Sequence, residues 1–327
     1  MTSSLRFSWF SRWNYLSFRR LIIALFLIAV NALAFPLPSS AQGKQELIGV
    51  ISGGITGTYA RFAAQMASVI DSEAIRVLPM LGKGSQQNIR DLMQINGIDI
   101  AIVQSDVLDF YKNTQEIPNI QDSIRYIGKL YNEEVHIVTR AGVETIKELE
   151  GALVGVGPAG SGTEMTALTL FEALGISVVP VNASNQEALD QVKEGALTAT
   201  VFVAGKPTPL IEAISAEDGL ILLPIELGKS VQGAYFSTRF THDDYPDLVD
   251  EAQSLDTVAV GAVLAVFNWR QGTPRYQAVS EFCADLLSAL EILKTGGAYH
   301  PKWQEVDLTV NVPGWQRFGG MEELLAN

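Results

Sequence analysis

The feature that most constrains the fold is a regular alternation of short, β-branched apolar runs with helical patterns. From Glu46 onward the runs read ELIGVIS, IRVLPM and IDIAIVQ, and the helical patterns that follow them begin at Thr58, at Ser85 and with SDVLDFY. Runs that are apolar on both faces are typical of strands buried on both sides, and strands that alternate with helices form parallel sheets with right-handed crossovers. The sequence therefore predicts an α/β fold.

The alternation starts a second time after an extended passage from Tyr126 to Arg140. ALVGVG, ISVVPV and ALTATVFVAG are each followed by a helical pattern, and a late apolar run, Thr257 to Phe267, leads into a helix over Arg275 to Lys294. About 286 residues after the leader exceed the size at which one hydrophobic core stops growing. We therefore expect two α/β lobes, each a mainly parallel sheet flanked by helices, joined by ordered strands rather than by a flexible linker. Residues 42–138 and 256–327 are predicted to form lobe 1, and residues 139–255 lobe 2.

The first 41 residues have the composition of an export signal. Four arginines and no acidic residue occur there, the apolar core runs from Leu21 to Val30, and Ser39 and Ala41 are small residues before a cleavage point. The apolar core is short against the roughly 20 residues that a membrane-spanning helix requires. We expect a signal peptide over residues 1–41, cleaved after Ala41, with an uncleaved membrane anchor as the alternative. In both cases the body of the protein is expected in the periplasm.

Charge and cysteine content exclude several classes of protein. Removal of the leader leaves 19 of the 23 Lys and Arg residues against all 36 acidic ones, a net charge of −17. Nucleic acid is excluded as a partner, because phosphate binding needs a basic surface. Cys283 is the single cysteine of the sequence, so no disulfide forms within one chain, and we expect it to be a small buried apolar residue.

Three strand-to-helix turns share one composition. They read SGGITGTY (Ser52 to Tyr59), GKGSQQN (Gly82 to Asn88) and GPAGSGTEM (Gly157 to Met165). The first turn of each following helix carries unpaired N–H groups and the positive end of the helix dipole, so it can receive a carboxylate without a charged side chain. One such turn alone is an ordinary helix start. Three of them at the carboxyl ends of strands, where open α/β sheets bind ligands, predict a site for a small organic anion.

Two further strand ends supply polar side chains. The third strand ends in VQSD, which places Gln104, Ser105 and Asp106 where they could line a crevice, although Asp106 is equally suited to cap a helix. VAGKPTPL contains Lys206, which we interpret as the one cation near these turns able to meet an anionic ligand. The alternative is a lysine on the solvated surface.

Other functional motifs are weak or absent from the sequence. GVGPAG at Gly155 to Gly160 matches the dinucleotide-binding pattern, but Asn182 follows where a ribose-binding acid is expected, so no cofactor is predicted. His136, His242 and His300 lack ligand spacing, so no metal site is predicted, and His136 is expected to be a hydrogen-bonded core residue. The sequence contains no nucleophile-elbow, Walker A or zinc-protease motif.

The ordered set of motifs resembles the TAXI family of solute receptors for tripartite (TRAP) transporters. The resemblance extends from about Leu47 to about Leu290 and includes SGGITGTY, GKGSQQNIRDL, IDIAIVQSD, GPAGSGTEMTA and VFVAGKPTPLI. It implies a two-lobed periplasmic binding protein fold of type II, with crossing strands between the lobes. It also implies an extracytoplasmic receptor that holds a small organic anion, such as glutamate or another carboxylate, between the lobes and delivers it to a TRAP-type permease. The residues that the resemblance implies as ligand contacts are Ser52, Gly53, Thr56, Gly57, Tyr59, Ser85, Gln104, Ser105, Asp106, Ser161, Gly162, Thr163, Ala204 and Gly205.

The first turn departs from the family after its tyrosine, where this chain has ARF in place of a further aromatic residue and a proline. Arg61 is therefore interpreted either as a solvated helix residue or as a contact at the rim of the site. Two other functions remain open from sequence: an exported enzyme that uses the same cleft, and a ligand-sensing subunit of a membrane kinase. An enzyme would need a nucleophile beside a base, and no histidine follows the Ser and Thr turns at a suitable position.

Overall fold

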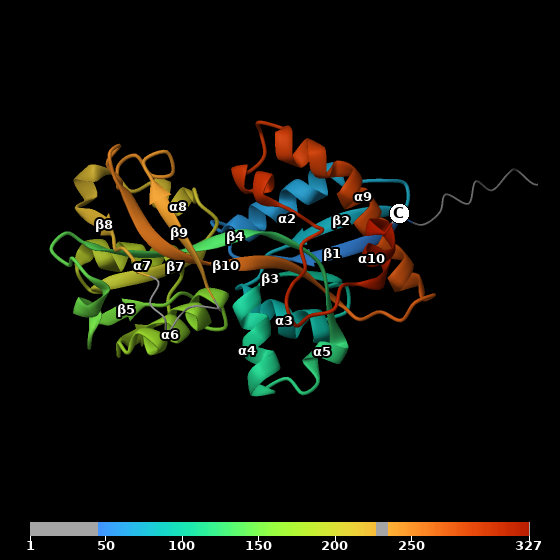
Figure 1. Cartoon of the computed structure of the whole chain (residues 1–327), viewed down its shortest axis with the longest axis horizontal. Coiled ribbons are helices and arrows are strands. Elements are labelled where there is room, and N and C mark those ends of the chain that lie inside the picture. Colours follow the sequence, from blue (N-terminus) through green and yellow to red (C-terminus); the bar gives the residue numbers. More distant parts are fainter. Residues whose placement is uncertain (1–44, 227–234, 327) are drawn as a thin grey trace, which may run out of the picture. The chain divides into compact units, whose positions relative to one another are not determined.

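The computed structural model describes residues 45–226 and 235–326. Its strands form one mixed sheet in the order β2-β1-β3-β10-β4-β7-β5-β6, with β8 beside β4 and β9 beside β10 (Figure 1). The strands are β1 (Glu46–Ile51), β2 (Ile75–Met80), β3 (Ile100–Gln104), β4 (Ile124–Arg140), β5 (Leu153–Gly155), β6 (Val179–Val181), β7 (Ala199–Ala204), β8 (Leu220–Leu222), β9 (Phe236–Thr241) and β10 (Ser254–Phe267). The leader predicted for residues 1–41 lies outside the described residues.

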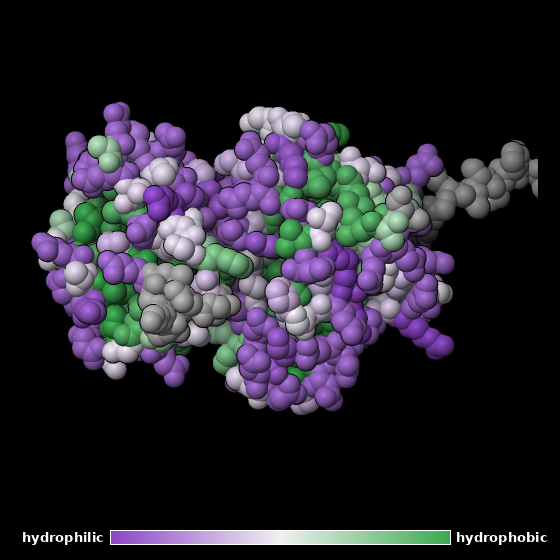
Figure 2. All heavy atoms as spheres, viewed as in Figure 1, coloured by the Kyte–Doolittle hydropathy of each residue, from purple (hydrophilic) through white to green (hydrophobic). Residues whose placement is uncertain are grey.

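Helices cover both faces of the sheet, as the alternating sequence pattern predicts (Figure 1). The α-helices are α2 (Thr58–Val69), α3 (Ser85–Gln94), α4 (Ser105–Thr114), α5 (Ile120–Ser123), α6 (Gly162–Leu174), α7 (Asn185–Glu194), α8 (Pro209–Glu212), α9 (Pro274–Thr295) and α10 (Gly319–Leu325). Short 3-10 helices are η1 (Ile146–Leu149), η2 (Ala216–Asp218) and η3 (Pro301–Glu305). Within residues 45–226 and 235–326, no helix combines the length and apolar character needed to cross a bilayer. Hydrophilic side chains cover most of the face drawn in Figure 2.

Lobe 1 contains the parallel strands β2, β1 and β3, and its core lies on both faces of this sheet. Ile100 and Ile102 of β3 pack with α2 and α9 on one face, while Ala101 and Val103 pack with α3 and α4 on the other. Side chains alternate between the two faces of a strand, so a strand covered on both sides must be apolar at every position. Cys283 of α9 is buried among these apolar residues, as expected.

Lobe 2 repeats the arrangement with the parallel strands β7, β5 and β6. Leu170 and Phe171 of α6 pack against one face, and Leu189 and Val192 of α7 belong to the core cluster on the other. The predicted α/β fold with two mainly parallel lobes is therefore confirmed.

Two long antiparallel strands, β4 and β10, cross from one lobe to the other. They pair with each other from Phe267↔Ile124 to Ala259↔Glu134, beyond which β4 pairs with β7 and β10 with β9. Glu133 and Glu134 lie at this point of exchange, opposite Val260 and Ala259. The crossing strands confirm the predicted connection, whereas the predicted lobe boundaries stay a prediction.

Gly49 offers a test of the packing in lobe 1. A side-chain carbon at this position of β1 would collide with the carbonyl oxygen of Gly97 and with Met80, and backbone cannot move aside as a flexible side chain can. We expect Gly49→Ala to lower the free energy of unfolding by roughly 1–3 kcal/mol, the usual cost of overpacking a core. Urea denaturation measures the change. The control is Gly297→Ala, because a side-chain carbon at Gly297 would meet nothing within 4 Å; equal effects of both substitutions would contradict the packing described.

Candidate functional site

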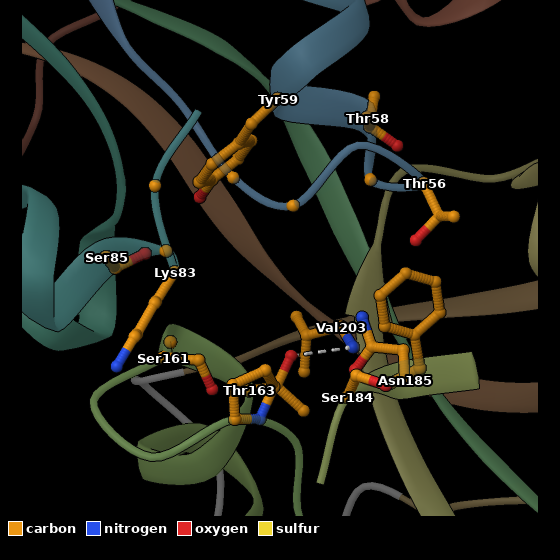
Figure 3. A pocket seen from close by; sticks show the side chains of 18 of the residues that line it. Thr56, Thr58, Tyr59, Lys83, Ser85, Ser161, Thr163, Ser184, Asn185 and Val203 are labelled. Atoms are coloured by element: carbon orange, nitrogen blue, oxygen red, sulfur yellow. Dashed lines mark hydrogen bonds between the residues drawn. The ribbon is translucent and has the colours of Figure 1, made fainter. Parts of the chain in front are cut away.

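A cavity of about 380 Å³ lies between the two lobes, at the carboxyl ends of their parallel strands. Lobe 1 contributes the turns before α2 and α3 together with Gln104, and β4 contributes Glu133. Lobe 2 contributes the starts of α6 and α7 and the end of β7. The lining residues are Gly53, Gly54, Ile55, Thr56, Gly57, Thr58, Tyr59, Gly82, Lys83, Gly84, Ser85, Gln104, Glu133, Pro158, Ser161, Gly162, Thr163, Ser184, Asn185, Gln186, Phe202 and Val203. Figure 3 shows Thr56, Thr58 and Tyr59 on one side of this cavity and Ser161, Thr163, Ser184 and Asn185 on the other.

The two helix starts of lobe 1 present backbone donors to the cavity. Gly57 is the N-cap of α2 and Gly84 the N-cap of α3, and neither makes a side-chain cap hydrogen bond. The first turn of each helix also lacks acidic residues. Apart from the Gln87 N–H, which donates to the Gly160 carbonyl, these N-terminal N–H groups can hydrogen-bond an anionic ligand, because no side chain satisfies or neutralises them.

Gly84 also allows the lobes to approach each other. Its φ of 117° lies in a region that side chains disfavour, and a side-chain carbon there would lie 3.3 Å from the Gly162 nitrogen. At Gly162 a side-chain carbon would collide with the Gln104 amide. Glycine thus fits both sides of the narrow contact between α3 and α6, at Gly84 because of its φ and at Gly162 because the Gln104 side chain fills the adjacent space.

The third turn differs from the first two, because its own side chains accept hydrogen bonds from some of its backbone N–H groups. The Ser161 hydroxyl accepts a hydrogen bond from the Glu164 N–H at 3.1 Å, and the Glu164 carboxylate accepts one from Gly160 at 2.7 Å. Thr163 accepts a hydrogen bond from the Val203 N–H at 3.3 Å, drawn as a dashed line in Figure 3. Ser161 and Thr163 line the cavity, but their hydroxyls also hold lobe 2 together.

Direct hydrogen bonds join the lobes beside the cavity. The Gln87 N–H donates to the Gly160 carbonyl at 3.0 Å, and the Gln86 amide donates to the Ser161 carbonyl at 3.1 Å. The Thr166 hydroxyl of α6 donates to Asp106 of α4 at 2.7 Å. These contacts close one side of the cavity, so the structure is a closed arrangement of the two lobes.

Nine of the fourteen residues predicted as ligand contacts line the cavity: Gly53, Thr56, Gly57, Tyr59, Ser85, Gln104, Ser161, Gly162 and Thr163. The other five, Ser52, Ser105, Asp106, Ala204 and Gly205, lie behind the lining. The Ser52 hydroxyl donates to the Met80 carbonyl at 2.7 Å, and the Ser105 hydroxyl accepts from the Gly261 N–H at 3.1 Å. The Gly205 carbonyl accepts from Thr58 at 3.2 Å. These contacts give Ser52, Ser105 and Gly205 structural roles; that the nine lining residues contact a ligand stays a prediction.

Among the described residues, the cation that lines the cavity is Lys83, not Lys206 as the sequence suggested. Lys206 forms an ion pair with Asp244 at 2.8 Å and donates a hydrogen bond to the Arg239 carbonyl, so its charge is neutralised within lobe 2. Sequence proximity to a strand end did not show where the side chain points. Lys83 lies inside the GKGSQQN turn and could have been found there. Arg61, the other basic residue considered from sequence, is exposed and does not line the cavity.

Sequence reasoning also missed Glu133, which lies on the crossing strand β4. Its carboxyl group accepts a 2.6 Å hydrogen bond from the Tyr59 hydroxyl, and both side chains are buried. Burial raises the pKa of Glu133 well above its usual value, and the nearby Asp106 raises it further. Two adjacent carboxylates inside the apolar run YNEEVHIV were the available signal.

His136 is a buried core residue, as expected. One ring nitrogen lies 3.1 Å from the Phe202 carbonyl and the other 2.7 Å from the Tyr245 hydroxyl. Burial lowers the pKa of His136 to about 3, so the ring is neutral at physiological pH. Across the part of the chain that the structure describes, no group of three or more His, Cys, Asp or Glu side chains is arranged to hold a metal ion.

The fold of two α/β lobes joined by crossing strands is that of periplasmic binding proteins. The periplasmic binding protein BugD is similar at a TM-score of 0.51 and 15% sequence identity, over 81% of this chain and 89% of that one. The alkanesulfonate-binding protein SsuA from Xanthomonas axonopodis pv. citri matches at a TM-score of 0.45 and 13% identity, over 79% of this chain and 81% of that one. A periplasmic binding protein from Brucella ovis matches at a TM-score of 0.44 and 16% sequence identity, over 79% of this chain and 76% of that one. The chain belongs to the NMT1-like family, whose model matches residues 50–270.

Asp106 makes stability depend on pH. Burial raises its pKa from 3.8 to about 6, so between these values the folded state holds a proton that the unfolded state has released. The free energy of unfolding therefore falls as pH rises from about 4 to 6, by an amount on the order of 2 kcal/mol from this group. We expect Asp106→Asn, which keeps an acceptor for Thr166, to remove that part of the slope in urea denaturation at several pH values. Asp122→Asn, an exposed control, should leave the slope unchanged; an unaltered slope in Asp106→Asn would contradict this account.

Proposed function

We propose that this protein is an extracytoplasmic solute receptor that binds a small organic anion between its two lobes. The observation that carries the proposal is the convergence of the α2, α3 and α6 starts on one cavity at the strand ends, with the first two free of side-chain caps. Such N-termini bind anions through backbone N–H groups and the helix dipole. Glutamate or another carboxylate is the ligand class that fits these donors.

The charge around the cavity supports an anion despite the acidic composition. Lys83 is the cation among the described residues that line the cavity, and its exposed side chain stands at the α3 start. A net charge of −17 after removal of the leader repels anions at long range. Salt screens that repulsion beyond about 10 Å, so the local donors decide the affinity.

Both lobes contact the cavity, and this couples binding to closure. A ligand that receives donors from α2 and α3 of lobe 1 and packs on Phe202 and Val203 of lobe 2 makes more contacts in the closed arrangement than in an open one. A ligand shifts a conformational equilibrium by its difference in affinity for the two states. The closed form is then the signal that the receptor presents to its membrane partner.

The transport partner and location complete the proposal. Membership in the NMT1-like family and the fold shared with periplasmic BugD support a receptor outside the cytoplasm. The sequence resemblance to TAXI receptors supports delivery to a TRAP-type permease, and the composition of residues 1–41 supports export.

The lining of the cavity favours binding over catalysis. Neither histidine nor cysteine occurs among the described residues that line it, and the Ser85 hydroxyl is bonded to Gln104 at 3.0 Å. Nucleophilic catalysis needs a hydroxyl or thiol beside a base that can accept its proton. His136 is buried in the core and does not line the cavity.

Isothermal titration calorimetry with L-glutamate, 2-oxoglutarate and succinate tests the proposal. We expect at least one of these acids to bind with a stoichiometry of about one, because the described residues form one such cavity at the lobe junction. Turnover of a bound acid into product would support the enzyme alternative. No binding across a broad panel of organic anions would refute the receptor.

Lys83 and Lys206 form a matched pair of variants. We expect Lys83→Met to weaken binding of a dicarboxylate about two- to fivefold, since an exposed charge contributes roughly 0.5–1 kcal/mol. Lys206→Met should leave affinity unchanged, because Lys206 is paired with Asp244 in lobe 2. Calorimetry on both variants makes the comparison, and a larger loss in Lys206→Met would show that the wrong cation has been assigned.

A further inference from the structure

A carboxyl group without a cationic partner lies on the lobe 1 side of the cavity. Glu133 is 3% exposed and lines the cavity from β4. Among the described residues, its side chain receives one hydrogen bond, from the Tyr59 hydroxyl at 2.6 Å to one carboxyl oxygen. The second oxygen is the group that Glu133 can offer to a ligand.

Burial and the carboxyl groups of Asp106 and Glu134 disfavour a negative charge on Glu133, and they outweigh the Tyr59 hydroxyl and the Lys302 ammonium, which favour it. Tyr59 faces it from α2, Asp106 from α4, Tyr131 and Glu134 from β4 itself, and Lys302 from η3. The Lys302 ammonium is already held by Glu134 at 2.6 Å and by Glu305 at 2.7 Å. Adjacent residues of a strand point to opposite faces, so the Glu134–Lys302 pair lies on the other side of β4 from Glu133.

A buried carboxyl group in such surroundings keeps its proton. Desolvation disfavours the charged form, and the carboxyl of Asp106 nearby adds like charge, so the pKa of Glu133 is raised well above its usual value. A protonated carboxyl group has an O–H donor that a carboxylate lacks. The protonated carboxyl group thus gives the cavity an O–H donor, which differs in kind from the N–H donors of lysine, arginine and amide side chains.

We propose that Glu133 is a ligand-binding residue that donates its carboxyl proton in a hydrogen bond to an oxygen of the bound anion, with Tyr59 as the residue that positions it. This inference rests on the proposed function, because it assigns a second kind of donor to the same anion site. It makes the receptor selective for ligands that present an acceptor oxygen beside the α2 start.

The alternative is an ionised Glu133 that binds an ammonium group of the ligand. The helix starts argue against it, because α2 and α3 direct the positive ends of their dipoles at the same cavity and disfavour a cation there. Tyr59, which donates to Glu133, belongs to the first turn of α2. The two assignments require different protonation states of Glu133 for binding. Substitution of Glu133 by glutamine, its neutral isostere, distinguishes them.

Binding then depends on pH in a definite direction. The site binds while Glu133 is protonated, so affinity is full below the pKa of Glu133 in the free protein and falls as pH rises above it. One proton is taken up per ligand in that range, which corresponds to a loss of about tenfold in affinity per pH unit. Asp106 has a pKa of about 6, so its contribution to the pH dependence of binding must be distinguished from that of Glu133.

The experiment measures the affinity for succinate, which carries no ammonium group, and for L-glutamate from pH 6 to 9. Glu133→Gln keeps a neutral donor and an acceptor for Tyr59, so we expect it to bind succinate within about threefold of wild type at pH 7 and to lose the fall in affinity at high pH. Glu133→Leu, without a donor, should lose about tenfold or more at pH 7. Asp106→Asn should keep the high-pH fall, and Glu281→Gln, the same substitution at an exposed position on α9, should match wild type.

Each contrary result overturns the assignment. Loss of L-glutamate binding in Glu133→Gln with succinate unaffected would show that an ionised Glu133 binds an ammonium group. Equal affinities in the Gln and Leu variants, or a fall with pH that survives in Glu133→Gln, would show that Glu133 does not donate to the ligand.

If neither acid binds, that result counts against the proposed function and not against the assignment of Glu133. A measurement without ligand then tests the protonation of Glu133 by itself. Infrared difference spectra between wild type and Glu133→Gln at pH 7.5 should show a protonated carboxyl band that the variant lacks. Absence of that band would overturn the inference whatever ligand the receptor takes. Thermal unfolding of each variant confirms that it is folded.

Discussion

The pairing of β4 with β10 is the constraint on which the rest of the structure depends. Each strand runs through both lobes, and beyond Glu134 and Ala259 each exchanges its partner for a strand of lobe 2. The parallel strands of each lobe attach to this pair, so their carboxyl ends, and the helices that begin there, face one another across the junction. A cavity lined by helix starts is a geometric consequence of that arrangement.

The same junction concentrates buried carboxyl groups, and their surroundings give them different states. Glu134 is matched by the Lys302 ammonium at 2.6 Å and the Lys206 N–H at 2.9 Å, although burial raises its pKa to about 7. Glu133, one residue earlier, has the neutral hydroxyl of Tyr59 instead. Buried charges are stable only when paired, so the Lys302 ammonium favours the charged form of Glu134, whereas burial without a paired cation favours the neutral form of Glu133.

The elements of lobe 1 could be predicted closely from sequence. The helix expected over Arg275 to Lys294 spans Pro274–Thr295, and the helices expected at Thr58 and Ser85 begin at those residues. Local patterns are sufficient there, because glycine and hydroxylated residues at the end of an apolar strand favour a helix start wherever the chain folds. Nine predicted residues line the cavity for the same reason. Ser52, Ser105 and Asp106 do not, because their polar groups are bonded to Met80, Gly261 and Thr166 across distances that no local pattern encodes.

The sequence by itself determined the alternation of strands and helices, the glycine-rich starts of α2, α3 and α6, and thereby a two-lobed α/β protein with backbone donors at its strand ends. These properties depend on residues close together in the chain. The tertiary structure alone decided that Lys83 and not Lys206 lines the cavity, and that Glu133 lies beside Tyr59, 74 residues away. Which side chain reaches the cavity depends on strand register and on competing partners, and both are set only when distant segments pack together.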